Sequence, residues 1–158
     1  MISRKIENGI KGNINIPSDK SISHRSIIIP SISMGISEIN NLLMSDDVIH
    51  TLNALKTLGV NIEKSNDKII IYGEGLNSLK KPNKNIYLGN SGTSARLLTG
   101  LLASQTFETI LEGDHSLSSR PMKRIVDPLK LMGAEFENIS GTLPLKIIGK
   151  RLNKSTIE

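Results

Sequence analysis

The chain has 158 residues, 37% of them apolar, and its 20 Lys and Arg residues against 15 Asp and Glu give a formal charge of +5. That length suits one modest domain or two small lobes, and no apolar run is long enough for a membrane span. Because cysteine is absent, disulfide bonds, thiolate metal sites and a cysteine nucleophile are excluded.

The positive charge leaves two classes of partner open. Nucleic acid is one class, but aromatic residues make up only 3% of the chain and tryptophan is absent, so bases would find few side chains to stack on. A mild excess of scattered cations suits small anionic ligands at least as well.

The first half of the chain is expected to alternate strands and helices. Alternating apolar and polar residues predict a strand over 12–16. A helix follows over 21–34, capped by Ser21, with Pro30 bending it or ending it early and Gly35 stopping it. The remaining elements of this half are expected at 38–43 (strand), 45–59 (helix), and 60–64 and 68–72 (strands around a turn).

The same βαβαββ order returns after a polar stretch. Arg25 and Arg96 lie 71 residues apart, each one turn into its helix, so the two halves read as copies of one unit filling 12–149. Such alternation predicts an α/β fold, with the units packed helix side to helix side. The elements of this half are expected at 86–88 (strand), 92–103 (helix), 107–112 (strand), 121–132 (helix, with a kink near Asp127 caused by Pro128), and 134–137 and 145–148 (strands).

Two predicted helix starts combine hydroxyl groups with cations. At residues 19–25 (DKSISHR), Lys20 stands at the helix entry and Arg25 lies one turn beyond Ser21. At residues 88–96 (LGNSGTSAR), glycines allow close backbone approach and Arg96 follows. Helix N-termini with such side chains bind anions. The alternative reading is a capped helix with solvated cations in the first case and a turn that merely needs glycine in the second.

A third helix start is expected at residues 114–124 (DHSLSSRPMKR). Pro121 suits the first helical position, and Arg120 would then project at the helix mouth, where it can grip a carboxylate or phosphate. An ordinary surface arginine is the competing interpretation.

The remaining polar residues give weaker signals. His24, His50 and His115 lack the spacing of metal ligands, so roles at the surface or in support of other residues are favoured. The carboxylates at 46–47 are explained by helix capping, and those at 112–114 form no convincing acid–base pair.

Together, the three segments resemble the 5-enolpyruvylshikimate-3-phosphate synthase family (3-phosphoshikimate 1-carboxyvinyltransferases), most closely its bacterial class II, along the whole chain. The resemblance implies repeated βαβαββ units in an inside-out α/β barrel, with two of the three units of one lobe present. It implies transfer of the enolpyruvyl group from phosphoenolpyruvate to the 5-hydroxyl of shikimate 3-phosphate. That reaction lies on the shikimate pathway to chorismate and the aromatic amino acids, in the cytoplasm, and needs no cofactor.

The same resemblance assigns roles at the first helix start. Lys20, Ser21 and Arg25 are expected to hold shikimate 3-phosphate, and Lys20 also to reach phosphoenolpyruvate. Lys20 is the expected catalytic residue, because a fixed cation stabilises charge on the departing phosphate.

At the second and third helix starts, Gly92 and Arg120 match positions that bind phosphoenolpyruvate. Asn90 and Thr93 are expected to shape the supporting loop. The partners implied are therefore small anionic substrates, with neither nucleic acid nor membrane, and no metal site is expected.

The resemblance also implies an N-terminal fragment. Residues 1–16 would lead from the other lobe, 12–76 and 84–149 would form the two units, and 150–158 would be a basic tail before a missing third unit. We expect a monomer at full length, no turnover by the fragment alone, and an apolar face left exposed where partners are missing.

Three alternatives remain at this point. A UDP-N-acetylglucosamine enolpyruvyl transferase shares the repeat but usually has Asn after the motif lysine and a catalytic Cys, whereas Ser21 follows Lys20 here. RNA 3′-phosphate cyclases share the architecture, but their histidine motif is not evident. A basic RNA-binding module would show steeply salt-dependent binding to random RNA.

Overall fold

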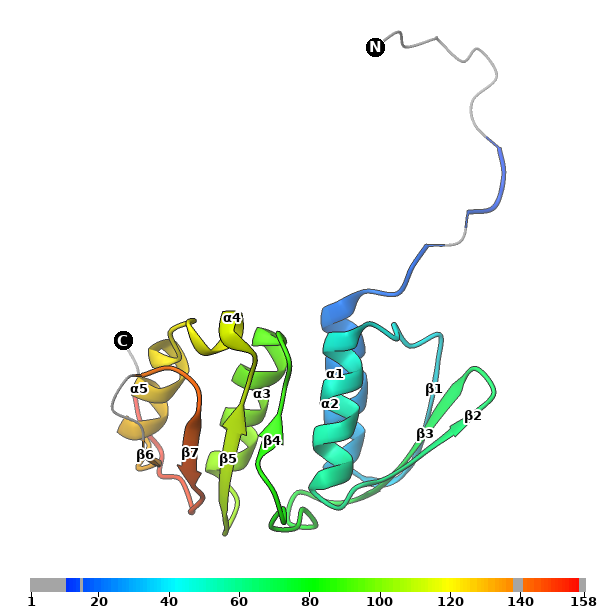
Figure 1. Cartoon of the computed structure of the whole chain (residues 1–158). Helices are drawn as coiled ribbons and strands as arrows, with labels where there is room; N and C mark the ends of the chain where they lie inside the picture. Colours follow the sequence, from blue (N-terminus) through cyan, green and yellow to red (C-terminus); the bar gives the residue numbers. More distant parts are fainter. Residues whose placement is uncertain (1–10, 15, 138–140, 157–158) are drawn as a thin grey trace, which may run out of the picture.

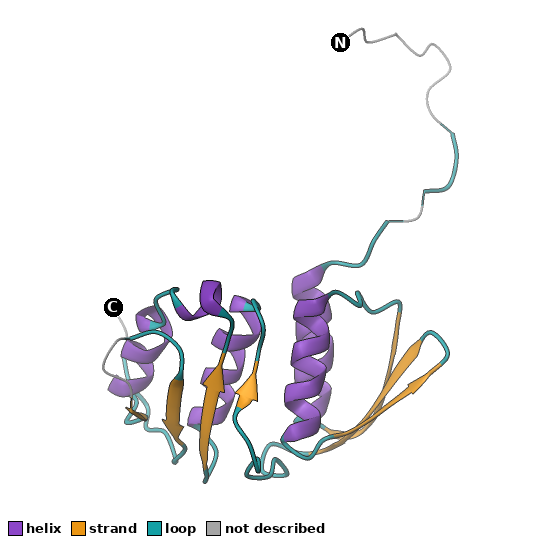
Figure 2. Cartoon of the chain, in the orientation of Figure 1, coloured by secondary structure: helices purple, strands orange, loops and turns teal. Residues whose placement is uncertain are grey.

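The computed structural model describes residues 11–14, 16–137 and 141–156. Within these ranges the chain forms a mixed α/β fold of helices and two separate sheets (Figure 2). The first two helices lie in the middle of the molecule, with the three-stranded sheet on one side of them and the four-stranded sheet on the other (Figure 1). None of the helices in the described ranges is long and apolar enough to cross a membrane.

The first sheet has three strands and is antiparallel throughout. Its central strand, β3, pairs with β1 on one side and β2 on the other. The β2–β3 hairpin turns at Asn66, whose φ of 50° is the left-handed conformation that asparagine tolerates in tight turns. The elements of this half are α1 (Lys20–Ser31), β1 (Met34–Asn40), α2 (Asp46–Thr57), β2 (Asn61–Ser65) and β3 (Lys68–Glu74).

The second sheet has the strand order β4-β5-β7-β6, with β4 parallel to β5 and the other pairs antiparallel. The order β5-β7-β6 matches β1-β3-β2, so the two halves differ by β4, which has no equivalent in the first sheet among the described residues. The elements of this half are β4 (Ile86–Tyr87), α3 (Gly92–Ala103), β5 (Glu108–Glu112), α4 (His115–Ser118), α5 (Lys123–Leu131), β6 (Glu135–Glu137) and β7 (Leu145–Ile148).

One hydrophobic core joins the halves, because α1 and α2 both contact α3. Ile27 on α1, Leu55 on α2 and Leu98 on α3 are fully buried members of that core. Each such side chain contributes about 1.5–3 kcal/mol relative to an exposed one. The predicted packing of helices against helices is confirmed.

The predicted strand over 12–16 is wrong. Among its described residues, Ile14 and Ile16 are 82% and 73% exposed and belong to no strand, while position 15 lies outside the described residues. An alternating pattern yields a strand only where a ladder partner and a covered face exist, and none of the described strands pairs with this segment.

Helix α1 begins and ends earlier than predicted. Asp19 rather than Ser21 is the cap, since the Asp19 carboxylate accepts the Ile22 backbone N–H at 2.6 Å. The helix passes through Pro30 and ends at Ser31. Sheet pairing starts directly afterwards, so Gly35 lies in β1 rather than stopping the helix.

The helix predicted at Pro121 starts two residues later, and a short helix before it was not predicted. Asp114 caps α4 by accepting the Leu117 N–H at 2.7 Å. The Met122 N–H donates to the Gly141 carbonyl at 2.8 Å, and the Met122 side chain is buried, so α5 begins only at Lys123. Pro128 lies inside α5, and the kink expected near Asp127 stays a prediction.

Several large apolar side chains of the first half are exposed. They include Ile22 and Ile29 on α1 and Met34 and Ile36 on β1. Residues seven apart on a helix share a face, so the two α1 isoleucines are exposed on the same face of that helix. The apolar face expected where packing partners are missing stays a prediction.

Candidate functional site

The N-termini of α1, α2 and α3 lie at one end of the molecule, where β4 and β5 also end (the upper edge of Figure 1). Helix N-termini carry free N–H groups and partial positive charge. This end is therefore electropositive from its backbone alone, and most of the predicted site residues lie along it.

The start of α1 is tied to the start of α2 by an ion pair. The Lys20 Nζ lies 2.8 Å from Asp47 Oδ2, with the lysine side chain 52% exposed and the carboxylate 24% exposed. We call this pair the lysine corner. An ammonium group has three donors, so Lys20 keeps donors for a ligand while Asp47 holds it in place.

Ser21 and Arg25 share the start of α1 and are exposed. Among the described residues, Arg25 lies within 4.0 Å of no carboxylate, and the same holds for Arg96 and Arg120. An arginine that forms no such ion pair has N–H donors available to an external anion.

Two arginines converge on the first residue of α3. A Cβ built on Gly92 would lie 3.2 Å from Nη1 of Arg96 and 3.2 Å from Nη1 of Arg120. Both guanidinium groups therefore stand beside the Gly92 backbone at a helix N-terminus. We call Asn90, Gly92, Arg96 and Arg120 the glycine–arginine cluster.

Arg120 is oriented by its neighbours. Its Nη2 donates to Asn90 Oδ1 and, at 3.3 Å, to Ser116 Oγ. Asn90 Nδ2 in turn donates to Asp114 Oδ2 at 2.9 Å. The Leu117 backbone N–H lowers the pKa of Asp114 most, with contributions from Asn90 and Arg120, so the carboxylate stays ionised and anchors the whole arrangement.

The loop before the cluster requires glycine at its turn. Gly89 has a φ of 56°, and a Cβ there would lie 2.3 Å from the His50 ring. The Gly89 carbonyl accepts the Asp114 N–H at 2.9 Å, which fastens the ends of β4 and β5 together. His50 also packs edge-on against Tyr87, with ring centroids 5.5 Å apart.

A buried hydrogen-bond chain of His24, Thr51, Ser94 and Ser91 links the three helix starts. His24 Nδ1 is 2.9 Å from Thr51 Oγ1, which is 2.5 Å from Ser94 Oγ. Ser94 Oγ is 2.5 Å from Ser91 Oγ, and Ser91 caps α3. His24 is fully buried, contrary to the surface role that the sequence left open, and burial lowers its pKa.

The structure thus brings three of the predicted site residues, Asn90, Gly92 and Arg120, into one cluster. It places Lys20 in the lysine corner, which the buried chain connects to α3. Thr93 is half-buried as the second residue of α3.

Three contributors were missed from the sequence. Asp47 was explained as a helix cap, whereas its carboxylate holds Lys20. Asp114 and Ser116 position Asn90 and Arg120 of the glycine–arginine cluster. The N-cap pattern at Asp114 was the one available signal, and it marks a helix start rather than a contact with residue 90.

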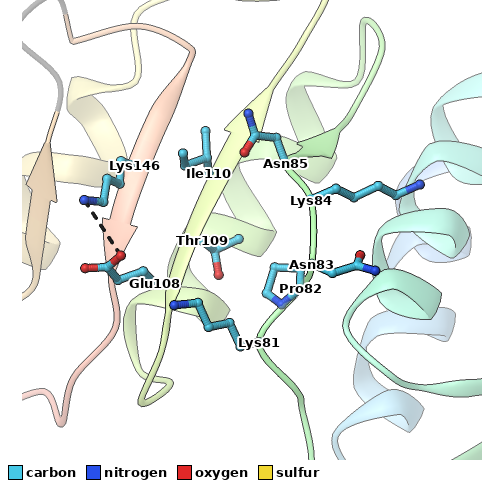
Figure 3. A pocket seen from close by; sticks show the side chains of 9 residues that line it. All are labelled: Lys81, Pro82, Asn83, Lys84, Asn85, Glu108, Thr109, Ile110 and Lys146. Carbon is cyan, nitrogen blue, oxygen red and sulfur yellow. Dashed lines mark ion pairs between the residues drawn. The ribbon is translucent and has the colours of Figure 1, made fainter.

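A pocket of about 170 Å³ lies away from this end (Figure 3). It opens between the segment 81–85 and the beginning of β5, and its lining includes Thr109 and Lys146. Lys146 already pairs with Glu108 at 3.8 Å and with Glu137 at 3.0 Å. None of the predicted site residues lines it.

Comparisons with known proteins agree on one family. The family model described as EPSP synthase (3-phosphoshikimate 1-carboxyvinyltransferase) matches residues 5–158. A 3-phosphoshikimate 1-carboxyvinyltransferase of Vesicomyosocius okutanii is 51% identical over 142 residues, covering 90% of this chain and 33% of the relative. One of Lactiplantibacillus plantarum is 45% identical over 150 residues, covering 95% and 35%.

A solved structure of EPSP synthase from Acinetobacter baumannii matches with a TM-score of 0.86 and 43% identity, covering 92% of this chain and 33% of that one. The chain spans about a third of the length of the curated relatives it matches. The family match extends over nearly the whole chain, and the fold agrees with it. The chain belongs to the EPSP synthase (3-phosphoshikimate 1-carboxyvinyltransferase) family.

Proposed function

We propose that this chain forms part of the substrate site of an enzyme that transfers the enolpyruvyl group of phosphoenolpyruvate to the 5-hydroxyl of shikimate 3-phosphate and releases phosphate. The observation that carries the proposal is the convergence of the Arg96 and Arg120 guanidinium groups on Gly92 at the α3 N-terminus. Both substrates are small anions, and each carries a phosphate and a carboxylate. Family membership supports the same reaction, because the matched relatives bear its name.

The glycine–arginine cluster is the proposed binding place of phosphoenolpyruvate. Gly92 leaves room between the two guanidinium groups. Arg120 is held by Asn90 and Ser116 through Nη2, which leaves its Nη1 beside Gly92 for the ligand. Planar guanidinium groups bind carboxylates and phosphates with two parallel hydrogen bonds. Thr93 adds a hydroxyl group at the same helix start.

The start of α1 is the proposed binding place of shikimate 3-phosphate, through Lys20, Ser21 and Arg25. These side chains are exposed there. Lys20 serves both substrates and is the proposed catalytic residue. Its ammonium group, fixed by Asp47, stabilises negative charge on the phosphate as the phosphate departs.

The proposed organisation is two βαβαββ units, 12–76 and 84–149, of a three-unit lobe, with 1–16 leading from a second lobe and 150–158 leading onward. The matching orders β1-β3-β2 and β5-β7-β6 support the two units. Turnover then requires the remaining length found in the relatives, and the complete protein works as a cytoplasmic monomer.

Two assays test this function with the chain as it exists. Phosphate release is measured from phosphoenolpyruvate with and without shikimate 3-phosphate, and we expect none in either case. Binding of shikimate 3-phosphate is followed by NMR at the Lys20 and Arg25 side chains, where we expect saturable shifts that Lys20→Ala weakens. Steeply salt-dependent binding of random RNA, without any response to shikimate 3-phosphate, would overturn the proposal in favour of an RNA-binding module.

A further inference from the structure

The buried hydrogen-bond chain contains a histidine with one unused nitrogen. His24 is fully buried, and its Nδ1 contacts Thr51 Oγ1. Its Nε2 is also buried and has no partner among the described residues. The protonation state and tautomer of His24 therefore decide whether every buried donor in the hydrogen-bond chain has an acceptor.

One assignment of the protons satisfies each bond of the chain and leaves no buried N–H of His24 without an acceptor. Thr51 has one hydroxyl proton, and its oxygen lies 3.2 Å from the Asp47 carbonyl, which can only accept. With that proton donated to Asp47, the Thr51 oxygen accepts from His24 Nδ1–H and from the Ser94 hydroxyl. Ser94 then accepts the Ser91 hydroxyl proton.

The end of the chain closes on the backbone of α3. The Ser91 oxygen accepts the Ser94 backbone N–H at 3.3 Å, which is the helix cap itself. Each hydroxyl proton in the chain is used once, and the scheme requires a proton on Nδ1 of His24. Neutral His24 then leaves on Nε2 only a lone pair.

A second proton on His24 would bury an unpaired, charged donor. The charged groups that act on the ring are Asp47 on α2, which favours the charged form, and Lys20 on its own helix, which opposes it. The groups that the α3 end contributes to the hydrogen-bond chain are the uncharged hydroxyl groups of Ser91 and Ser94. Burial outweighs the attraction of Asp47, so the neutral ring is the native form.

We propose that neutral, Nδ1-protonated His24 is a positioning residue that holds the start of α3, and with it Gly92 and Arg96, against the start of α2 beside the lysine corner. The inference rests on the proposed function, since it treats these helix starts as one anion site. A second proton on His24 leaves a buried, charged N–H on Nε2 without an acceptor. The ring must then move toward water and withdraw Nδ1 from Thr51, so anion affinity falls on acidification even when the charge of the anion is constant.

The ring state is tested directly by NMR of the ¹⁵N-labelled chain. The His24 ring signals are assigned by their absence from His24→Asn. We expect the Nδ1–H tautomer, with the ring still mostly neutral at pH 6.5, the ordinary histidine pKa. The Nε2–H tautomer, or a charged ring at that pH, would overturn the proposal.

A conservative replacement separates positioning from packing. Asparagine places an amide N–H near the position of Nδ1 but does not titrate, whereas leucine offers no donor. Binding of sulfate, which keeps its charge throughout, is measured at the Arg96 and Arg120 side chains at about pH 7.5 and about pH 4.5.

We expect the wild-type affinity for sulfate to drop by at least about twofold on acidification, in proportion to the loss of the neutral ring. The affinity of His24→Asn should stay level, and that of His24→Leu should be low at both pH values. Equal pH profiles for wild type and His24→Asn would overturn the proposal. If the wild type binds no sulfate at either pH, the proposed function fails, while the tautomer measurement still decides the positioning role.

Matched threonine variants test the chain without changing histidine. Thr51→Val removes the shared oxygen. Thr99→Val is the control, because Thr99 is equally buried, lies on α3 and bonds its own helix at Ala95 at 2.7 Å. Each is combined with Ser94→Ala in urea unfolding. For Thr51→Val with Ser94→Ala, we expect the effect on the folding equilibrium constant to differ by at least about fivefold from the product of the two single effects. For Thr99→Val with Ser94→Ala, we expect the two effects on the free energy of unfolding to add. Additivity of both pairs contradicts the chain.

Discussion

Replacing Gly92 with alanine should weaken ligand binding without destabilising the fold. The new Cβ would lie 3.2 Å from Nη1 of Arg96 and from Nη1 of Arg120, about 0.2 Å inside the 3.4 Å at which ordinary contact begins. Both neighbours are the far ends of flexible side chains, so the fold accommodates the methyl group at little cost. Glycine is unfavourable in helices, so the free energy of unfolding should stay level or rise by up to about 1 kcal/mol.

Binding should respond in the opposite way. The methyl group fills the space between the two guanidinium groups, where an oxygen of phosphoenolpyruvate would lie about 2.9 Å from a donor. We expect its affinity to fall at least about tenfold, or about 1.4 kcal/mol, measured by NMR titration beside urea unfolding.

Gly100→Ala is the matched control for Gly92→Ala. Gly100 lies on the same helix, and a Cβ there meets nothing within 4 Å, so it should gain stability and bind as the wild type does. Unchanged binding by Gly92→Ala, or loss of its fold, would refute the reasoning.

Three further predictions concern charged residues. Arg120→Ala should weaken phosphoenolpyruvate binding at least about tenfold, because it removes charge-assisted hydrogen bonds, whereas Arg124→Ala, exposed on α5, should leave the same titration unchanged. Asp47→Asn should lower the free energy of unfolding by less than about 1 kcal/mol, since its partner Lys20 is half exposed, but should weaken substrate binding more than that. Because the pKa of Asp114 is lowered in the folded state, its carboxylate stabilises the fold at pH values above 3.8, the ordinary pKa, and this stabilisation is lost as the pH falls through the lowered pKa. Asp114→Asn should therefore make the free energy of unfolding less dependent on pH on the acid side.

Local signals in the sequence predicted most elements of the second half, apart from α4 and the start of α5. Helix α3 (Gly92–Ala103) and strand β7 (Leu145–Ile148) were predicted with their observed bounds. Glycine before a capped helix and a β-branched run after a turn are short-range patterns, so adjacent residues suffice to reveal them. The segment 12–16 has an equally good local pattern but no paired neighbour among the described strands, which only the structure reveals.

The site was predicted as a set of residues rather than as a set of contacts. The bonds Lys20 to Asp47, Asn90 to Asp114 and Arg120 to Asn90 join residues 27, 24 and 30 positions apart. Such contacts depend on how strand ends and helix starts meet in space. No spacing rule within one helix or strand reaches them.

The lysine corner and the glycine–arginine cluster are proposed to bind one anionic ligand together. The most direct test of this shared binding is a phosphoenolpyruvate titration in which the side-chain NMR signals of Lys20, Arg96 and Arg120 are followed together. A shared site predicts that all three shift and saturate with one dissociation constant. Shifts at the two arginines with Lys20 unmoved, or separate dissociation constants, would contradict it.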